Sequence, residues 1–541
     1  MSDTVLSLDR LTVRLPRGAD RPHALSDVSL SVASNEILCV VGESGSGKSM
    51  MANTIMRLLP NEVSIEQGRM MFDGHDLCAA DPSEMRDVRG AGIAMIFQEP
   101  MTALNPLRTI GDQIGEMFAI HTQLSKAEIA ARVQALLEDV RIPDPKAAAK
   151  AYPHELSGGQ RQRAMIAMAL ALDPKLLIAD EPTTALDVTT QAQILKLIRD
   201  LQQRKKTAVL FITHDFGVVA EIADRVVVMQ HGVIVEQGAA EKVLNDPQHA
   251  YTKQLIAAVP PLKAPAPRLL SGKSILTIDG VSKTYRTGGF LGRGARVTDA
   301  VKNVSLHLPR GATLGIVGES GSGKSTLARC IVRLIDPDAG SIRLDGRDWA
   351  KLTRDEVRGE TRHIQMVFQD PFASLNPRRK AAELVAQGPI VHGTDRATAI
   401  VEARKLFELV GLDPSAGDRY PHEFSGGQRQ RIGLARALAL KPDVLVADEP
   451  VSALDVSVQA QVLKLLAGLR QQLGLSIIFI THDLRVAAQI CDLVAVMKDG
   501  AVVEQGLTAE VFGNPQHPYT QALLSAIPGG AFAREHGTAT V

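Results

Sequence analysis

Two segments of the chain carry the residue types that bind the phosphates of a nucleotide. Residues 42–49 and residues 318–325 both read GESGSGKS, which is the G-x-x-x-x-G-K-[ST] pattern. In this pattern the glycines let successive backbone N–H groups turn toward the phosphates, the lysine neutralises their charge, and the last hydroxyl binds Mg²⁺. An ordinary glycine-rich turn would explain one copy, but two copies that each follow a short apolar run predict a pair of phosphate loops.

All residues of both loops are therefore predicted to contact a nucleotide. The first loop comprises Gly42, Glu43, Ser44, Gly45, Ser46, Gly47, Lys48 and Ser49, and the second comprises Gly318, Glu319, Ser320, Gly321, Ser322, Gly323, Lys324 and Ser325.

An acidic pair follows a second apolar run in each half of the chain: Asp180-Glu181 in KLLIADEP and Asp448-Glu449 in DVLVADEP. An aspartate at a strand end can hold Mg²⁺ through water, and the adjacent glutamate can orient the attacking water of phosphoryl transfer. A solvated acidic turn is the alternative, but the same arrangement recurs in both halves. The metal ligands predicted from these residues are Ser49, Asp180, Ser325 and Asp448.

A second type of phosphate site follows from LSGGQ (156–160) and FSGGQ (424–428), which we call the signature motifs. A Ser-Gly-Gly run that enters a helix offers a hydroxyl, unhindered N–H groups and the helix dipole. One domain cannot use both its loop and its signature motif on one nucleotide. The residues predicted here to bind nucleotide are Ser157, Gly158, Gly159, Gln160, Ser425, Gly426, Gly427 and Gln428.

The chain consists of two similar halves. YPHELSGGQRQR (152–163) and YPHEFSGGQRQR (420–431) differ at one position. In both halves the signature serine lies 23 positions before the aspartate of the acidic pair, and that aspartate lies 34 positions before the histidine of ITHD. We expect a first domain over 1–260, a proline-rich linker over 261–275, a second domain over 276–528 and a polar tail without fixed structure over 529–541. Short apolar runs alternate with helical patterns, which predicts an α/β fold with a parallel sheet. The segments 99–160 and 370–428 are expected to be helical.

Composition excludes several classes of protein. Of the 541 residues, 45% are hydrophobic and 22% are charged, which is typical of a folded globular chain. The 60 basic and 60 acidic residues balance, so we expect no nucleic-acid partner. The 4 cysteines lie far apart, which indicates neither disulfides nor a zinc site. No apolar run approaches the roughly 18 residues of a membrane span, and the N-terminus lacks a signal-peptide pattern.

In the order of its motifs, the chain resembles the ATP-binding cassette ATPases over about 5–260 and 276–528. The resemblance implies two tandem cassettes, each with a RecA-like P-loop core, an antiparallel β edge and an α-helical signature subdomain. It also implies ATP and Mg²⁺ as cofactors, and head-to-tail pairing in which each signature motif completes the nucleotide site of the opposite half.

The resemblance carries over further residues. Gln98 and Gln369 match the loop glutamine that touches Mg²⁺ and the nucleophilic water, and His214 and His482 match the switch histidine. Ala185-Leu186-Asp187 and Ala453-Leu454-Asp455 match a loop that crosses the interface of the pair. Both halves keep every motif, so we expect two sites that hydrolyse ATP. The predicted catalytic residues are Glu181, Glu449, His214, His482, Gln98 and Gln369, and the two glutamines are also predicted metal ligands.

The segments EPMTALNP (99–106) and DPFASLNP (370–377), and the endings NDPQHAYTKQLIAAVP (245–260) and GNPQHPYTQALLSAIP (513–528), resemble the oligopeptide, dipeptide and nickel importers. This implies a peripheral ATPase subunit on the cytoplasmic side of the cell (inner) membrane that powers import of peptides.

The implied partners are two multi-spanning permeases, docked near Gln98 and Gln369, and through them an extracytoplasmic substrate-binding protein. Glutathione and nickel chelates are alternative cargoes. A soluble dual-cassette ATPase of the ribosome is the alternative of another class, but the short linker argues against it. Since 261–275 and 529–541 contain no cysteine, we predict no iron–sulfur cluster.

One position differs between the halves. Aligning LSLDRLTVRL (6–15) with LTIDGVSKTY (276–285) places Leu15 where the second half has Tyr285, a position at which the family stacks an aromatic ring on adenine. Such stacking is worth on the order of 1 kcal/mol. We therefore predict weaker or less base-selective ATP binding at the first site. Nucleotide affinities measured separately in Lys48→Ala and Lys324→Ala chains test this, and equal affinities with equal base selectivity would contradict it.

Overall fold

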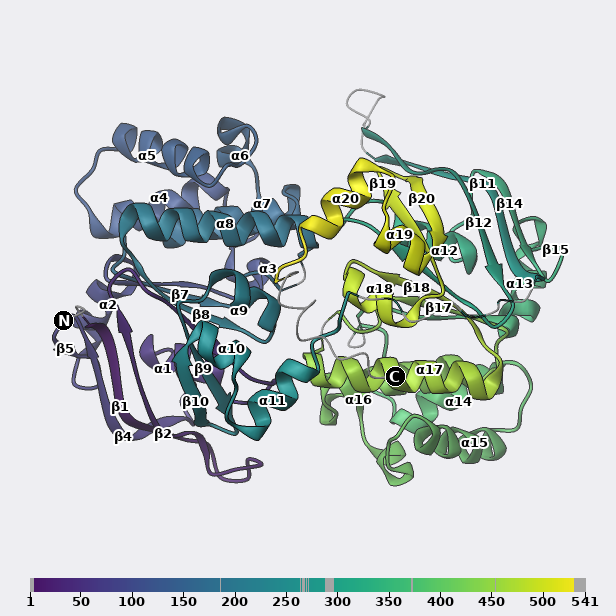
Figure 1. Ribbon diagram of the computed structural model, residues 1–541, viewed down its shortest axis with the longest axis horizontal. Coiled ribbons are helices and arrows are strands. Elements are labelled where there is room, and N and C mark those ends of the chain that lie inside the picture. The colour runs from purple at the N-terminus through teal and green to yellow at the C-terminus, as the bar shows by residue number, and fades with distance from the viewer. Residues whose placement is uncertain are drawn as a thin grey trace. The chain divides into compact units, whose positions relative to one another are not determined.

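The computed structural model describes residues 4–529 except 185, 263, 265–267, 269, 271, 288–295, 371–372 and 453. The chain divides into two compact units (Figure 1). The first consists mainly of the residues up to Leu186 and of Thr190–Val259, and the second consists mainly of Pro260–Ile527. Much of the predicted linker, and the predicted tail beyond Gly529, lie outside the described residues.

The central layer of the first unit is a six-stranded sheet with the order β10-β9-β3-β8-β7-β6. Its strands pair in parallel except for β10, which is antiparallel at one edge. All residues of β3, β7 and β8 are buried, as expected for strands that are covered on both faces. The strands are β3 (Ile37–Val41), β6 (Ile93–Ile96), β7 (Leu176–Asp180), β8 (Ala208–Thr213), β9 (Arg225–Gln230) and β10 (Val233–Ala239).

A second, antiparallel sheet of four strands has the order β2-β1-β4-β5. Its strands are β1 (Thr4–Arg14), β2 (His23–Ala33), β4 (Ser64–Phe72) and β5 (His75–Asp76). Leu6, Leu8 and Leu11 of β1 are buried in one cluster with Leu38 and Val40 of the parallel sheet. The unit therefore contains two antiparallel parts, the edge strand β10 and a separate four-stranded layer. The sequence predicted an antiparallel edge but not this separate layer.

Helices cover the sheets and form a separate group in the segment after β6. They are α1 (Lys48–Ile55), α2 (Pro82–Ala91), α3 (Pro100–Ala103), α4 (Ile110–His121), α5 (Lys126–Asp139), α6 (Pro145–Lys150), α7 (Gly158–Ala169), α8 (Val188–Lys205), α9 (Phe216–Ile222), α10 (Ala240–Asn245) and α11 (Ala250–Ala257). Figure 1 shows α4–α6 at the upper end of the unit. Apolar residues at helical spacing, such as Ile114 and Phe118 of α4 and Val133 and Leu137 of α5, are buried in one cluster.

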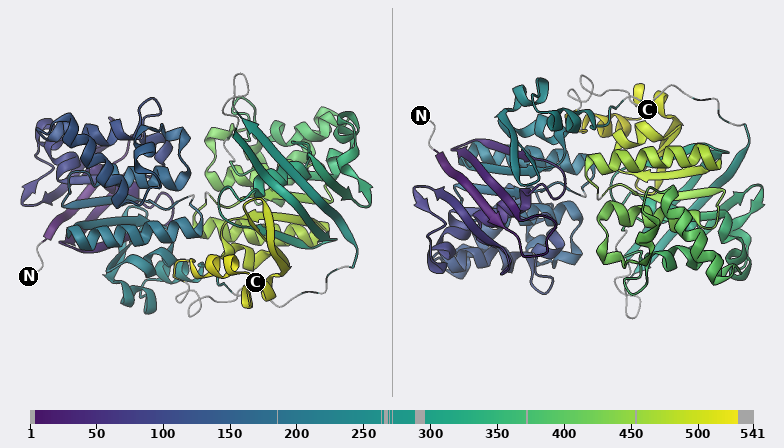
Figure 2. Two further views of the ribbon diagram at one scale, coloured as in Figure 1. Left: turned by 90° about the horizontal axis from the view of Figure 1, so that it is seen from above. Right: turned by 90° about the horizontal axis from the view of Figure 1, so that it is seen from below.

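The second unit repeats this arrangement, with a six-stranded sheet β16-β17-β18-β13-β19-β20 and a four-stranded sheet β12-β11-β14-β15. Its strands are β11 (Ser274–Thr287), β12 (Arg296–Pro309), β13 (Thr313–Val317), β14 (Ala339–Leu344), β15 (Arg347–Asp348), β16 (Ile364–Val367), β17 (Val444–Asp448), β18 (Ser476–Thr481), β19 (Leu493–Lys498) and β20 (Ala501–Leu507). Figure 2 shows the long paired strands of the antiparallel sheets, purple in the first unit and teal in the second.

The helices of the second unit follow the same order along the chain. They are α12 (Lys324–Ile331), α13 (Arg354–Glu360), α14 (Ala381–Val391), α15 (Arg396–Leu409), α16 (Gly426–Leu438), α17 (Val456–Leu473), α18 (Leu484–Ile490), α19 (Thr508–Gly513) and α20 (Pro518–Ser525). Within the described part of the chain, every helix is too short or too polar to span a bilayer.

A buried ion pair fixes the start of the central strand of the second unit. Asp492 Oδ2 accepts hydrogen bonds from Arg470 Nη1 at 3.0 Å and from the backbone N–H of Thr313 at 2.8 Å. The side chains of Arg470 and Asp492 are only 7% and 9% exposed. In the first unit the corresponding aspartate, Asp224, pairs instead with Arg199 at the surface. The two halves therefore share a fold but not this interaction.

Removing one partner of a buried ion pair leaves the other charge uncompensated, which costs about 3–5 kcal/mol. We predict that Asp492→Ala lowers the free energy of unfolding of the second unit by about that amount. Trp349 is the chain's single tryptophan, is 2% exposed and lies in the second unit, so its fluorescence during urea denaturation reports that unit. Asp224→Ala is the matched control and should leave the Trp349 transition in place. Equal midpoints for the two variants would contradict the prediction.

Candidate nucleotide-binding sites

The phosphate loop of the first unit connects β3 to α1 through a backbone that only glycine adopts readily. Gly42 has φ +156°, and a Cβ there would lie 2.3 Å from the carbonyl oxygen of Met229. Gly47 has φ +106° and immediately precedes α1, which begins at Lys48. The first glycine of the loop thus packs directly against the neighbouring strand, and the last glycine turns the chain into the helix.

Both loop lysines are buried and held by the loop itself. Lys48 Nζ donates to the carbonyl oxygens of Gly42 at 2.6 Å and Glu43 at 2.9 Å. In the second unit Lys324 Nζ makes the equivalent bonds at 2.7 Å each. Burial lowers the pKa of Lys324 despite several nearby carboxylates. Each ammonium is therefore fixed at the loop, where it would neutralise the charge of bound phosphates.

The predicted metal ligands lie next to each other in both units. Ser49 Oγ donates to Asp180 Oδ1 at 3.0 Å, and Ser325 Oγ donates to Asp448 Oδ1 at 3.1 Å. Burial raises the pKa of Asp180 to about 6, and the charge of Glu181 adds to this effect. A hydroxyl and a carboxylate oxygen side by side are the ligand type that Mg²⁺ prefers. The residues present thus fit a hard divalent cation.

The predicted catalytic residues converge on one glutamate in each unit. Glu181 Oε2 accepts hydrogen bonds from Gln98 Nε2 at 3.1 Å and Thr184 Oγ1 at 2.9 Å, and His214 Nδ1 lies 3.2 Å from Glu181 Oε1. Thr184 was not among the predicted site residues. Only its position three residues after Glu181 in the sequence could have indicated that it belongs to the site.

The second unit repeats this cluster. Gln369 Nε2 donates to Glu449 Oε2 at 2.9 Å, and His482 Nδ1 lies 3.3 Å from the same oxygen. Ser452, in place of the threonine, donates to the backbone carbonyl of Glu449 at 3.2 Å. In both units the structure therefore brings together a glutamate, a glutamine and a histidine that are far apart in the sequence.

Both glutamates have a left-handed backbone that is unusual for a residue with a side chain. Glu181 has φ +47° and Glu449 has φ +46°. Their N–H groups donate to the carbonyls of Ile212 and Ile480 on the adjacent strand, at 3.0 and 2.9 Å. Such a conformation costs about 1–3 kcal/mol and is concentrated at functional sites. Each glutamate thus lies outside the regular conformation of the strand that it follows.

Neighbouring carboxylates in the first site have very different pKa values. Burial alone would raise the pKa of Glu181, but the hydrogen bond and charge of His214, with help from Thr184, lower it to about 2. Burial likewise works against a charged His214, but Glu181 outweighs it and raises the histidine's pKa. Asp180, whose pKa is raised, and Glu181, whose pKa is lowered, are thus suited to different roles.

Two tyrosines that the sequence did not single out as site residues also contact the phosphate loops. The hydroxyl of Tyr251 in α11 accepts a hydrogen bond from the N–H of Glu43 at 3.1 Å. Tyr519 in α20 makes the same bond to the N–H of Glu319 at 3.2 Å, and Lys498 Nζ lies 4.8 Å from its ring centroid. Both occur in the Y-T of the endings, so the repeat itself was the available signal.

The signature motifs have a structural role at the helix starts. Ser157 Oγ accepts from the N–H of Gln160 at 3.3 Å, and Gln160 Oε1 accepts from the N–H of Ser157 at 2.9 Å, which is a capping box for α7. A Cβ on Gly159 would lie 2.8 Å from Thr190 Cγ2, so this glycine permits close packing with α8. Ser425 and Gln428 form the same capping box in the second unit.

The position that differs between the halves is also different in structure. Leu15 packs against the core of the antiparallel sheet in the first unit. Tyr285 is half-buried in β11, where it pairs with Thr298 of β12. In the loops predicted to cross between the halves, Ala185 and Ala453 lie outside the described residues.

A family profile described as "ABC transporter" matches residues 25–184 and 301–452. The chain belongs to the ABC transporter family. A second profile, "Oligopeptide/dipeptide transporter, C-terminal region", matches residues 235–280 and 503–538. The prediction of two tandem cassettes is therefore confirmed, as is the prediction of an ATPase coupled to transport.

Similar proteins align over almost the whole chain. The glutathione import ATP-binding protein of Salmonella choleraesuis is 45% identical and covers 97% of this chain and 90% of its own length. The peptidoglycan transport ATP-binding protein of Agrobacterium fabrum is 48% identical, over 96% of both chains. A solved ATP-binding cassette, a dimeric post-hydrolysis state bound to ADP and Pi, is 31% identical over 43% of this chain and 98% of its own, with a TM-score of 0.40.

The glutamate–histidine pair makes the stability of the second unit depend on pH. The pKa of Glu449 is lowered from 4.5, so the stability that its carboxylate contributes is fully present above pH 4.5. The pKa of His482 is raised from 6.5, so the stability that its imidazole contributes is fully present below pH 6.5. That stability is lost as the pH rises through the raised pKa of the folded state. We predict that His482→Gln destabilises the Trp349 transition more at about pH 5.5 than at about pH 8.5. His307→Gln, at an exposed position of β12, is the control. A loss that is equal at both pH values would contradict the prediction.

Proposed function

We propose that this ABC-family ATPase powers the import of peptides or peptide-like compounds across the cytoplasmic membrane. The observation that carries the proposal is the second family match, which covers the end of both cassettes and is described for oligopeptide and dipeptide transporters. The names of the two similar proteins refer to glutathione import and to peptidoglycan transport, which adds both compounds to the candidate cargoes. A nickel chelate is an alternative within the same importer role, and action on the ribosome is the alternative of another class.

We infer that each site takes ATP with Mg²⁺. The loop N–H groups and Lys48 or Lys324 would hold the phosphates, and Ser49 with Asp180, or Ser325 with Asp448, would hold the cation, which supplies charge stabilisation when bound. The pairs of adjacent oxygens described above support this assignment.

Within each site the glutamate is the residue we assign to water activation. Its carboxylate is ionised because its pKa is lowered, and the glutamine and histidine bonded to it fix its orientation. In each site, the glutamine side chain and the histidine ring bonded to this glutamate would also be positioned to sense whether a γ-phosphate is bound. The signature residues, which begin α7 and α16, would complete the site of the opposite half.

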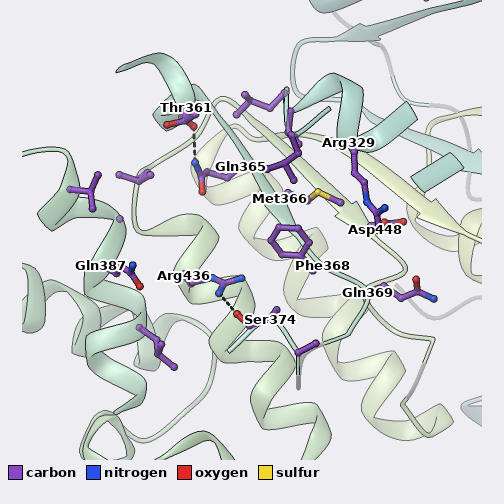
Figure 3. Close-up of a pocket in the computed structure, with 18 of the residues that line it drawn as sticks. Arg329, Thr361, Gln365, Met366, Phe368, Gln369, Ser374, Gln387, Arg436 and Asp448 are labelled. Carbon is purple, nitrogen blue, oxygen red and sulfur yellow. Dashed lines mark hydrogen bonds between the residues drawn. The ribbon is translucent and has the colours of Figure 1, made fainter. Parts of the chain in front are cut away.

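A groove in the second unit supports docking of a permease (Figure 3). It has a volume of 770 Å³ and is lined by apolar residues such as Met366 and Phe368 together with the polar Gln369 and Arg436. Gln369 also donates to Glu449, so one side chain borders both the groove and the predicted catalytic centre. A cytoplasmic segment of a permease that occupied the groove would therefore be coupled to hydrolysis. We propose that the chain acts on the cytoplasmic face of the inner membrane, as the resemblance to importer ATPases implies.

We predict that Glu181→Gln combined with Glu449→Gln lowers ATP hydrolysis by on the order of 100-fold or more while ATP still binds, because the amide cannot accept a proton from water. Phosphate release and equilibrium binding of ATP measure the two properties separately. Lys48→Ala with Lys324→Ala is the control that should lose binding as well. Hydrolysis at the original rate in the double glutamine variant would remove these glutamates from the mechanism.

The same double glutamine variant tests the transport role. Tagged and purified from native membranes with ATP, it should bring along two multi-spanning permeases and, through them, a route to the binding protein and its cargo. The double lysine variant, which should not close on ATP, provides the comparison. Recovery of ribosomal proteins in place of permeases would overturn the importer role and favour the ribosomal class.

A further inference from the structure

The connection between β1 and β2 of the first unit places an arginine on the phosphate loop. Arg21 Nη2 donates to the carbonyl oxygen of Gly45 at 2.5 Å. Its Nε is shielded from solvent and has no hydrogen-bond partner among the residues that the structure describes. A buried guanidinium N–H without an acceptor is unfavourable, so a group that brought an acceptor to this place would be bound more tightly.

The phosphate loops of the two units can be matched by the contact that each makes with a strand of its antiparallel sheet. A Cβ on the last glycine of the loop would lie 2.8 Å from the carbonyl oxygen of Ala24 in the first unit and 2.1 Å from that of Ala300 in the second. Ala24 and Ala300 therefore have the same place beside their loops. Three residues before them stand Arg21 and Val297, and Val297 is 57% exposed and has no side-chain donor.

The two units thus differ at two positions in their first two strands and the connection between them. The first unit has Leu15 packed into the core and Arg21 on the loop, whereas the second has the half-buried ring of Tyr285 and the small apolar Val297. Arg21 and Tyr285 thus stand at different positions of the corresponding strand pair. The guanidinium and the phenol ring are both planar groups that can stack on an aromatic base.

We infer that Arg21 contacts the nucleoside part of the nucleotide at the first site, where it takes the place that an aromatic ring has at the second. This inference rests on the proposed binding of ATP. Lys48 and Arg21 both donate to loop carbonyls but at different places, Lys48 at Gly42 and Glu43 and Arg21 at Gly45. Lys48 is the side chain assigned to the phosphates, and Arg21 lies at another part of the loop. Its planar face and its spare N–H suit a base and a ribose oxygen rather than the phosphate chain.

The test uses the full chain with Lys324→Ala, so that the first site is the one measured. In this background, Arg21→Val introduces the residue of the second unit. Calorimetric titration with ATP–Mg²⁺ should show an affinity about three- to tenfold lower than without the substitution. Titration with inorganic triphosphate, which has no nucleoside, should show affinities within about twofold of each other. Arg17→Val, at an exposed position of the same connection, is the matched control and should change neither.

A reciprocal variant gives the inference a second test. In a Lys48→Ala chain, Tyr285→Leu should weaken ATP binding at the second site, and adding Val297→Arg should recover part of the loss. Equal losses for ATP and triphosphate on Arg21→Val would mean that Arg21 only braces the loop, and unchanged ATP affinity would mean that it makes no contact; either result overturns the inference. Absence of ATP binding in the unsubstituted chain would instead overturn the proposed function.

Discussion

Each unit is organised around one glutamate, with a side chain only 12–13% exposed, that directly follows a central parallel strand. Glu181 follows β7 in a left-handed conformation, and its carboxylate contacts Gln98 and His214 from two other segments as well as Thr184 of its own loop. Gln98 comes from the end of β6 and His214 from the end of β8, which are the strands on either side of β7. The sheet order is therefore what assembles the site, since parallel neighbours end at the same edge.

The same strand order connects the site to the surface of the cassette. In the second unit, Gln369 follows β16, an edge strand of the sheet, and its side chain reaches from the groove to Glu449. An edge strand has one partner only, so the segment that follows it is covered less than the segments after the inner strands. A single hydrogen bond thus links a residue of the groove to the carboxylate of Glu449.

The repeat preserved the chemistry of the sites more closely than their surroundings. The loop, acidic pair, glutamine and histidine have nearly the same contacts in both units, with distances that agree within 0.2 Å for the Gln98 and Gln369 bonds, at 3.1 and 2.9 Å. In contrast, the buried Arg470 and Asp492 pair is particular to the second unit, as the loop-bound Arg21 is to the first. Tandem cassettes in one chain are free to differ wherever the phosphates and the cation are not directly involved.

The sequence predicts the repeat, the α/β class and the candidate site residues, because glycine-rich loops, buried strands and acidic pairs depend on local residue types and spacing. It did not predict the separate antiparallel layer, the capping role of Ser157 and Gln160, or the contacts of Thr184 and Tyr251. Those depend on which strands become neighbours and where a distant helix packs. None of these could be predicted from local patterns, since hydrogen bonds between residues as far apart as Glu43 and Tyr251 follow from tertiary packing.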